Sequence, residues 1–258
     1  MQVVFFGSPS FSLPALEALL DAGHRVPLVV SQPGKPVGRK GDVTDPPVAA
    51  RAKSLGIHVF QPSTLKDDAA VARLAEVPAD AFVVVAYGRI LAQRVLDLPR
   101  LGCLNVHGSL LPRWRGASPV QAAILAGDAV TGVSIMKMDA GMDTGPVYAL
   151  RETPIGEEET AKELGVRLAA MGADALVETL ILLEGEGGSA VPQDSSLATT
   201  CPKISREDAR VDWMRPAVEL VRRSRAFTPW PGLFTIRRNA RLKLFHICLL
   251  YTSDAADE

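Results

Sequence analysis

Cysteine is scarce in this sequence, and it lacks long apolar runs and a charged leader segment. Its three cysteines, Cys103, Cys201 and Cys248, have unrelated spacings, which excludes a disulfide framework and a zinc site of the usual pattern. The longest clearly apolar run, residues 81–87, is far shorter than the roughly 20 residues that a membrane span needs. The opening residues MQVVFFG have neither the basic region nor the cleavage site of a secretory signal. We therefore expect a protein without a membrane segment that works in the reducing cytoplasm.

Two phosphate-binding motifs are also missing. Residues 2–6 predict a buried strand, residues 7–10 a turn that contains glycine, and residues 11–22 a helix. This turn has neither G-x-G-x-x-G nor G-x-x-x-x-G-K-[ST]. The sequence therefore gives no support for an NAD site, although the first elements are those of a Rossmann-like unit.

Strands and helices alternate along most of the chain. The predicted strands are residues 2–6, 26–31, 57–60, 81–85, 103–106, 131–138 and 147–152. The predicted helices are residues 11–22, 47–55, 67–76, 89–96, 120–125 and 160–183. This alternation predicts an α/β protein with a Rossmann-like parallel sheet that helices cover on both faces.

The charge is distributed unevenly. The net charge is −1, yet residues 203–245 contain 11 Lys and Arg against 4 Asp and Glu, whereas residues 1–202 contain 17 basic and 22 acidic residues. Residues 185–202 are rich in Gly, Ser, Thr and Pro and predict a linker. A basic region after an acidic domain predicts a polyanionic partner.

The polar segment 32–46 has two interpretations. It is rich in Pro and Gly and contains Lys35, Arg39 and Lys40. A loop of this length inside a compact domain is often functional or mobile. It is either a solvated excursion or an arm that reaches a phosphate backbone, and the segment alone does not decide between them.

The candidate site follows the strand 103–106. Asn105 and His107 are two residues apart and so share one face, and Asp139 and Asp143 lie in the Gly-rich turn after the next strand. Ligands of open α/β sheets bind outside the carboxyl ends of the strands. Turn chemistry alone would explain the two aspartates.

Several long strings resemble the methionyl-tRNA formyltransferase family. They are NVHGSLLPRWRGASPV, TGVSIMKMDAGMDTGPVY, RAFTPWPG, SQPGKPVGRKG and KISREDARVDW. SLLP after Asn-x-His is shared by folate-dependent formyltransferases, whereas RWRGASP and the basic C-terminal region indicate the tRNA-acting member. Gly108 is a departure, because members of that family usually have Ala there.

The resemblance implies a fold, a reaction and a set of site residues. The fold is a formyltransferase domain (1–184), a linker (185–202) and a partial C-terminal β-barrel of the oligonucleotide-binding type (203–247). The reaction moves formyl from 10-formyltetrahydrofolate to the α-amine of initiator methionyl-tRNA, without a metal, in a chain expected to be a monomer. The implied catalytic residues are Asn105, His107 and Asp143, and the folate-contacting residues are Ser109, Leu110, Leu111 and Pro112. The implied tRNA contact is Arg39, and we add its basic neighbours Lys35 and Lys40.

These residue types suit formyl transfer. Asn105 offers an N–H to the oxyanion that develops when an amine attacks the formyl carbonyl. His107 either stabilises that oxyanion as the imidazolium or takes the amine proton as the neutral ring, and the sequence leaves this open. Asp143 would orient the imidazole and favour its charged form.

Two other functions remain possible from the sequence. One is a different formyl-folate enzyme with the same trio, acting on glycinamide ribonucleotide or hydrolysing the formyl-folate, which would not need the basic region. The other is a tRNA-binding relative without catalysis, although all three trio residues are present. We also expect residues 248–258, CLLYTSDAADE, to be a non-native tail on an incomplete C-terminal domain, since the resemblance ends near residue 247.

Overall fold

The computed structural model describes residues 1–37, 41–185, 187–245 and 247–248. The predicted tRNA contacts Arg39 and Lys40, and all of the expected tail except Cys248, lie outside the described residues. No helix in the described part of the chain is long and apolar enough to span a membrane.

The core of the molecule is a seven-stranded sheet with the strand order β10-β9-β7-β6-β1-β2-β5. The strands are β1 (Gln2–Gly7), β2 (Arg25–Val30), β5 (His58–Phe60), β6 (Ala81–Val85), β7 (Cys103–His107), β9 (Val130–Lys137) and β10 (Val147–Pro154). Five of them, from β5 to β7, are parallel. The predicted α/β class and Rossmann-like sheet are thus confirmed, but β9 runs antiparallel to both of its neighbours, β7 and β10, whereas the alternation of strands and helices predicts parallel strands.

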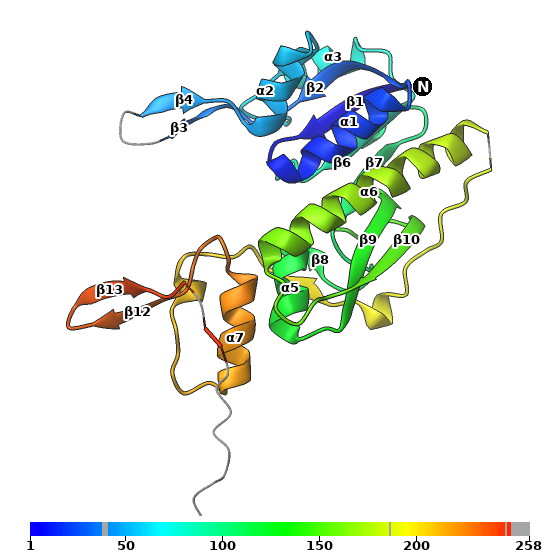
Figure 1. Cartoon of the computed structure of the whole chain (residues 1–258). Helices are drawn as coiled ribbons and strands as arrows, with labels where there is room; N and C mark the ends of the chain where they lie inside the picture. Colours follow the sequence, from blue (N-terminus) through cyan, green and yellow to red (C-terminus); the bar gives the residue numbers. More distant parts are fainter. Residues whose placement is uncertain (38–40, 186, 246, 249–258) are drawn as a thin grey trace, which may run out of the picture.

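Helices cover both faces of the sheet (Figure 1). They are α1 (Leu13–Asp21), α2 (Pro47–Ser54), α3 (Asp68–Ala75), α4 (Gln93–Leu96) and α6 (Ala161–Glu184), whereas α5 (Pro119–Ala126) lies beside α6. Val3 and Phe5 of β1 belong to the core formed with α1, α2 and α6. Val4 and Phe6 point the other way and pack with α3 and α4, as the period of two in a strand requires.

The reversed direction of β9 follows from the position of the helix that precedes it. Parallel neighbours need a crossover, usually a helix that packs on the sheet between them. The helix α5 stands between β7 and β9 in the chain but packs against α6 and the later helix α7 (Ala217–Ala226). The chain therefore returns beside β7 in the opposite direction.

One predicted helix is shorter than expected. The prediction was residues 89–96, whereas α4 contains only residues 93–96. Gly88 has a φ of +77°, and Ala92 is extended with a ψ of 153°. Both conformations are incompatible with a helix, so its start is displaced.

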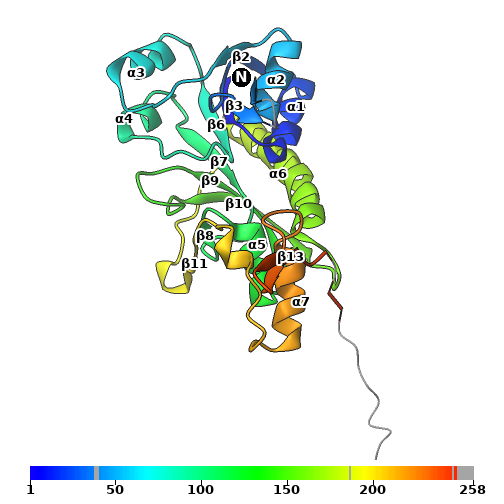
Figure 2. The same ribbon diagram turned by 90° about the vertical axis from the view of Figure 1, so that its left-hand side faces the viewer.

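Two hairpins project from the same side of the molecule (Figures 1 and 2). Within segment 32–46, β3 (Lys35–Val37) pairs with β4 (Asp42–Thr44). Near the other end of the described chain, β12 (Phe234–Arg237) pairs with β13 (Ala240–Lys243) around Asn239. Arg238 and Asn239 have φ of +48° and +64°, which a two-residue hairpin turn of type I′ requires.

The basic C-terminal region shares a core with the sheet domain. Leu220, Phe227 and Phe234 are buried against Ile124 of α5 and Leu164 of α6. The preceding segment, residues 187–202, crosses the sheet domain, and its short strand β11 (Thr200–Cys201) pairs with β8 (Arg115–Gly116). The segment predicted as a linker therefore lies against the domain that contains the candidate site.

Candidate active site

Strand β7 places two polar side chains at its carboxyl end. Asn105 pairs with Val84 of β6 and with Met136 of β9, and His107 pairs with Ser134 of β9. The strand is thus held on both sides, and His107 is only 5% exposed. The backbone that carries both side chains is therefore fixed by two ladders of hydrogen bonds.

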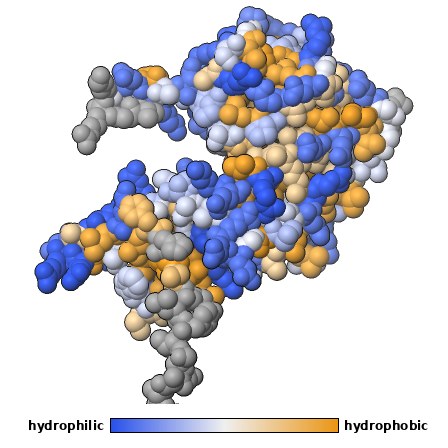
Figure 3. Space-filling model, in the orientation of Figure 1, coloured by the Kyte–Doolittle hydropathy of each residue, from blue (hydrophilic) through white to orange (hydrophobic). Residues whose placement is uncertain are grey.

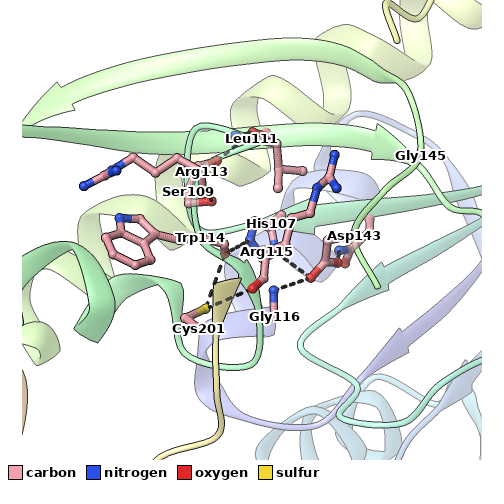
Figure 4. A network of polar contacts seen from close by, with 12 residues as sticks. His107, Ser109, Leu111, Arg113, Trp114, Arg115, Gly116, Asp143, Gly145 and Cys201 are labelled. Atoms are coloured by element: carbon pink, nitrogen blue, oxygen red, sulfur yellow. Dashed lines mark hydrogen bonds and ion pairs between the residues drawn. The ribbon is translucent and has the colours of Figure 1, made fainter. Parts of the chain in front are cut away.

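Asp143 joins the two residues of β7. Its Oδ1 accepts a hydrogen bond from Asn105 Nδ2 at 3.3 Å, and its Oδ2 lies 3.6 Å from His107 Nδ1. The same Oδ2 accepts from the backbone N–H of Gly116 at 2.8 Å. Figure 4 shows the carboxylate between the imidazole and Gly116. The structure thus brings the predicted trio (Asn105, His107 and Asp143) into one cluster.

The route by which Asp143 reaches the cluster differs from the expected one. A parallel β9 would have placed its following turn at the carboxyl edge directly. Because β9 is antiparallel, its last residue pairs with Leu104 near the start of β7, and the turn 138–146 has to return along β7. Asp143 has a φ of +54° within this turn, a conformation that Asp tolerates better than most residues.

His107 faces an acceptor on each side of its ring. Nε2 is 2.9 Å from the carbonyl oxygen of Trp114, and Nδ1 faces the Asp143 carboxylate. The ring is therefore held in one orientation, with an oxygen acceptor facing each of its nitrogens.

The loop 114–116, part of the string RWRGASP, supports the trio, a role that its sequence did not indicate. Trp114 donates its backbone N–H to Thr199 Oγ1 at 2.9 Å, and Gly116 pairs with Cys201. The Cys201 Sγ lies 3.4 Å from the Trp114 carbonyl oxygen; burial, and secondarily the Asp143 charge, raises the pKa of this thiol. No sequence signal links residues 199–201 to His107, because they lie in a stretch with the composition of a linker.

The outer part of this loop is fixed by Asp128. Its carboxylate accepts from Arg113 Nε at 2.9 Å and from the Trp114 indole N–H at 2.8 Å, and the Arg113 guanidinium stacks on the indole. Burial alone would raise the pKa of Asp128, but the hydrogen bonds from Arg113 and Trp114 outweigh it and lower that pKa. The ionised carboxylate orients Trp114, whose carbonyl oxygen faces His107.

The predicted folate-contacting residues form a rigid segment. Ser134 on β9 donates its hydroxyl to the Ser109 carbonyl oxygen at 2.6 Å and accepts the Leu111 N–H at 3.0 Å. Ser109 is fully buried and Leu111 nearly so, whereas Leu110 and Pro112 are half-buried. Only the last two present substantial side-chain surface, so Ser109 and Leu111 shape the segment from inside.

Two concavities are relevant to the location of ligands. One of about 320 Å³ is lined by Leu111, Pro112, residues 147–150 of β10 and residues 191–194. A larger one of about 480 Å³ is lined by residues such as Gln2, Asp80 and Arg100, which precede or begin strands and so mark the opposite edge of the sheet. Only the first borders the predicted folate-contacting segment.

Two further predictions concern metals and tRNA. Among the described residues, no group of three or more His, Cys, Asp or Glu side chains could hold a metal ion. Lys35 lies exposed on β3, and the hairpin that carries it projects from the sheet domain (Figure 1).

Comparison with known proteins identifies relatives along the whole chain. A family profile described as "Formyl transferase" matches residues 1–180, and one described as "Formyl transferase, C-terminal domain" matches residues 203–258. A methionyl-tRNA formyltransferase of Chromohalobacter salexigens is 51% identical over 245 residues, which are 95% of this chain and 75% of that relative.

Solved structures resemble the fold. HypX of Aquifex aeolicus in complex with tetrahydrofolic acid superposes with a TM-score of 0.72 at 19% identity, covering 95% of this chain and 37% of that one. Glycinamide ribonucleotide transformylase 1 of Symbiobacterium toebii gives a TM-score of 0.61 at 26% identity and covers 75% of this chain and 94% of its own.

Proposed function

This chain belongs to the formyl transferase family and is a formyltransferase, and from that premise we propose that it transfers formyl from 10-formyltetrahydrofolate to the α-amino group of initiator methionyl-tRNA. The observation that carries the proposal is the 51% identity to a methionyl-tRNA formyltransferase over 95% of the chain. This alignment is too long to be confined to the folate-dependent domain. It therefore includes the basic region that a tRNA would require.

The distribution of charge supports a tRNA acceptor. The β12–β13 hairpin carries the exposed basic residues Arg237, Arg238, Arg241 and Lys243, and Lys35 is exposed on β3. Both hairpins project on one side, and the surface between them is hollowed (Figure 3). Basic side chains on two projections suit a polyanion, because phosphate contacts dominate the affinity for nucleic acids.

The segment 109–112 supports folate as the donor. It is held rigidly by Ser134 and offers the half-buried Leu110 and Pro112 beside an open concavity. A flat ring system binds best to a preformed and mostly apolar wall. The donor would supply the activated formyl group, and these side chains would place it next to the trio.

The trio can stabilise charge that develops on the formyl oxygen. Asn105 Nδ2 uses one hydrogen toward Asp143, which leaves its second hydrogen for an oxyanion. His107 as the imidazolium would add a positive charge, and Asp143 would keep that charge in place. The acceptor amine has an unperturbed pKa of about 7.7–8.0, so much of it is already neutral near pH 7.5 and needs little base.

The amine proton must leave as the new C–N bond forms and the bond from formyl to folate N10 breaks. His107 can release a proton to N10 and regain one from the amine, so the ring ends as it began.

The whole site comes from one chain, so we propose that a monomer suffices. Because tRNA is charged in the cytoplasm, we place the reaction there.

A competition between acceptors tests the proposal. The chain would be incubated with 10-formyltetrahydrofolate labelled in the formyl carbon, together with methionyl initiator tRNA, methionyl elongator tRNA and glycinamide ribonucleotide. We expect label on the initiator tRNA well above the other two, and labelling that is about 10²–10³-fold slower with the His107→Ala variant. Label on the ribonucleotide alone, or release as formate without an acceptor, would support the other formyl-folate enzymes and contradict the proposal.

A further inference from the structure

Gln193 makes four hydrogen bonds that join two loops of the site. Its Oε1 accepts from Arg115 Nε at 3.0 Å and from Arg115 Nη2 at 2.9 Å. Its Nε2 donates to the carbonyl oxygens of Asp143 at 2.9 Å and Gly145 at 2.7 Å. Every hydrogen and both lone pairs of the amide are thus used. We call this set of contacts the Gln193 bridge.

The partners of the bridge require a side chain with both a donor and an acceptor. A guanidinium can only donate, and a backbone carbonyl can only accept, so the orientation of the amide is fixed by its neighbours. Arg115 is 8% exposed, and a buried charge without hydrogen-bond acceptors is costly. A glutamate at position 193 would still accept hydrogen bonds from Arg115. Its second carboxylate oxygen, however, would face the carbonyl oxygens of Asp143 and Gly145 and could donate no hydrogen bond to them.

The two loops joined by the bridge hold the trio from opposite sides. The loop 114–116 presents the Trp114 carbonyl oxygen to His107 Nε2 and the Gly116 N–H to Asp143 Oδ2. The turn 138–146 carries Asp143 itself at a φ of +54°, with its carbonyl oxygen bound by Gln193. The distance between the loop 114–116 and the turn 138–146 therefore sets the position of the Asp143 carboxylate relative to the His107 imidazole.

We propose that Gln193 is a positioning residue for the formyl-transfer reaction, acting through Asp143 and His107; this inference rests on the proposed function for its kinetic test. Gln193 lies 50 residues from Asp143 and 78 from Arg115 in the chain. Its own segment is fixed by the pairing of Val191 with Val147 and of Cys201 with Gly116. The bridge is thus anchored on both sides of Gln193.

The Gln193→Glu variant separates positioning from stability. It keeps the acceptor for Arg115 and gains an ion pair, but it loses both donated hydrogen bonds to the turn. We expect kcat to fall about 10- to 100-fold, because a misplacement of about 1 Å in a site can cost roughly 10²-fold. The KM for tRNA should stay within about threefold, and circular dichroism should show the native fold, with a melting temperature lowered only by the loss of the two donated hydrogen bonds.

Two further variants complete the kinetic test. Leu197→Ala is the matched control, since Leu197 lies in the same segment and is 66% exposed; its kcat should equal that of the wild type. In an Asp143→Asn background, Gln193→Glu should cost much less than in the wild type, because residues that act through one another are not additive. Full additivity, or a Gln193→Glu kcat within twofold of wild type, would overturn the proposal.

An NMR measurement tests the inference without any substrate. The chain has four histidines, so the imidazole nitrogen resonances of ¹⁵N-labelled protein can be assigned with a His107→Gln variant. Gln193→Glu should shift the His107 resonances and their titration, whereas Leu197→Ala should not. If the wild type formylates no tRNA but this shift occurs, the proposed substrate is wrong and the bridge stands. An unshifted His107 signal would overturn the bridge even in an active enzyme.

Discussion

At the residue scale, Asp143 has the largest number of partners in the trio. It accepts hydrogen bonds from Asn105 and Gly116 and faces the His107 ring. Its side chain is short and its φ is positive, which favours Asp over Glu in this turn. An acceptor at this point aligns both neighbours at once, so the trio is expected to function as a unit.

Replacing any member of the trio should lower the rate without unfolding the protein. For Asn105→Ala, His107→Ala and Asp143→Ala we expect kcat to fall about 10²–10³-fold, the usual cost of losing one charge-stabilising group. The measurement is single-turnover formyl transfer, with circular dichroism to verify folding. Asp139→Ala is the control, because Asp139 lies in the same turn and bonds only Gly141 and Thr144. Near-normal turnover in His107→Ala would contradict the assignment.

The cysteines should differ sharply in reactivity. Burial raises the pKa of Cys103 to about 12 and also raises that of Cys201, so both thiols stay protonated at pH 7, whereas Cys248 is exposed. A chromogenic disulfide reagent should label one thiol per folded chain quickly and all three after unfolding. Cys248→Ser should remove the fast phase. Rapid labelling of two or more thiols in the native chain would disprove this.

At the scale of elements, we expect substitutions in the β3–β4 hairpin to weaken the binding of tRNA but not the binding of folate. Lys35 is exposed on β3, and Arg39 follows it before β4 begins. For Lys35→Ala and Arg39→Ala we expect weaker binding of tRNA, with a smaller dependence on salt, and unchanged affinity for folate. Filter binding at several salt concentrations measures the first and fluorescence titration the second. Lys66→Ala, at another exposed position, provides the control, and equal losses in all three variants would argue against a specific arm.

The ion pair between Arg167 and Glu159 at the start of α6 should stabilise the fold at neutral pH and lose this effect in acid. Arg167 donates to both Glu159 oxygens, at 2.8 and 2.9 Å; these bonds, with one from Gly156, lower the pKa of Glu159. A lowered folded-state pKa gives stability that is complete above the unfolded value of about 4.3 and is lost as pH falls through the folded value.

Glu159→Gln should therefore reduce the melting temperature at pH 7, and its difference from the wild type should shrink below about pH 4. Differential scanning calorimetry between pH 3 and 7 measures this. Glu158→Gln serves as the control, since Glu158 is exposed. A difference that is constant with pH would mean that the ionised carboxylate contributes nothing.

At the scale of the whole molecule, the basic C-terminal region and the sheet domain are packed as one unit. Phe227 is 1% exposed and shares a core with Leu164 and Leu168 of α6. Arg225 Nη1 donates to the carbonyl oxygen of Gly156 at 3.0 Å, next to α6. These contacts fix the position of the β12–β13 hairpin relative to the site.

Phe227→Ala should destabilise the entire chain. Removing a buried phenylalanine typically costs about 3–5 kcal/mol, and denaturation should remain a single transition, because both parts contribute to the same core. In a Trp114→Phe background, the fluorescence of Trp213 and Trp230 reports on the C-terminal region, and circular dichroism reports mainly on the sheet domain. Phe245→Ala, at an 86% exposed position, should change little. Two separate transitions in the wild type would show that the regions unfold independently.

Local pattern was enough to locate the seven strands of the large sheet and the helices α1 to α6. Residues 81–85 form β6 with the predicted bounds, because a run of apolar β-formers between turns has few other solutions. The hairpin around Asn239 follows from turn chemistry in the same way. The trio residues Asn105, His107 and Asp143 were also identified from the sequence, through the strings that carry the family resemblance.

Only the tertiary structure decided how distant segments meet. The direction of β9 depends on where α5 packs, and packing is a property of surfaces that lie far apart in the chain. Gln193 has no local pattern that distinguishes it within a polar stretch, yet it contacts Arg115 and Asp143. Local propensities act over a few residues, whereas these contacts join residues 50 or more positions apart; the sequence therefore determined the elements and the candidate catalytic groups, and the fold determined what holds those groups in place.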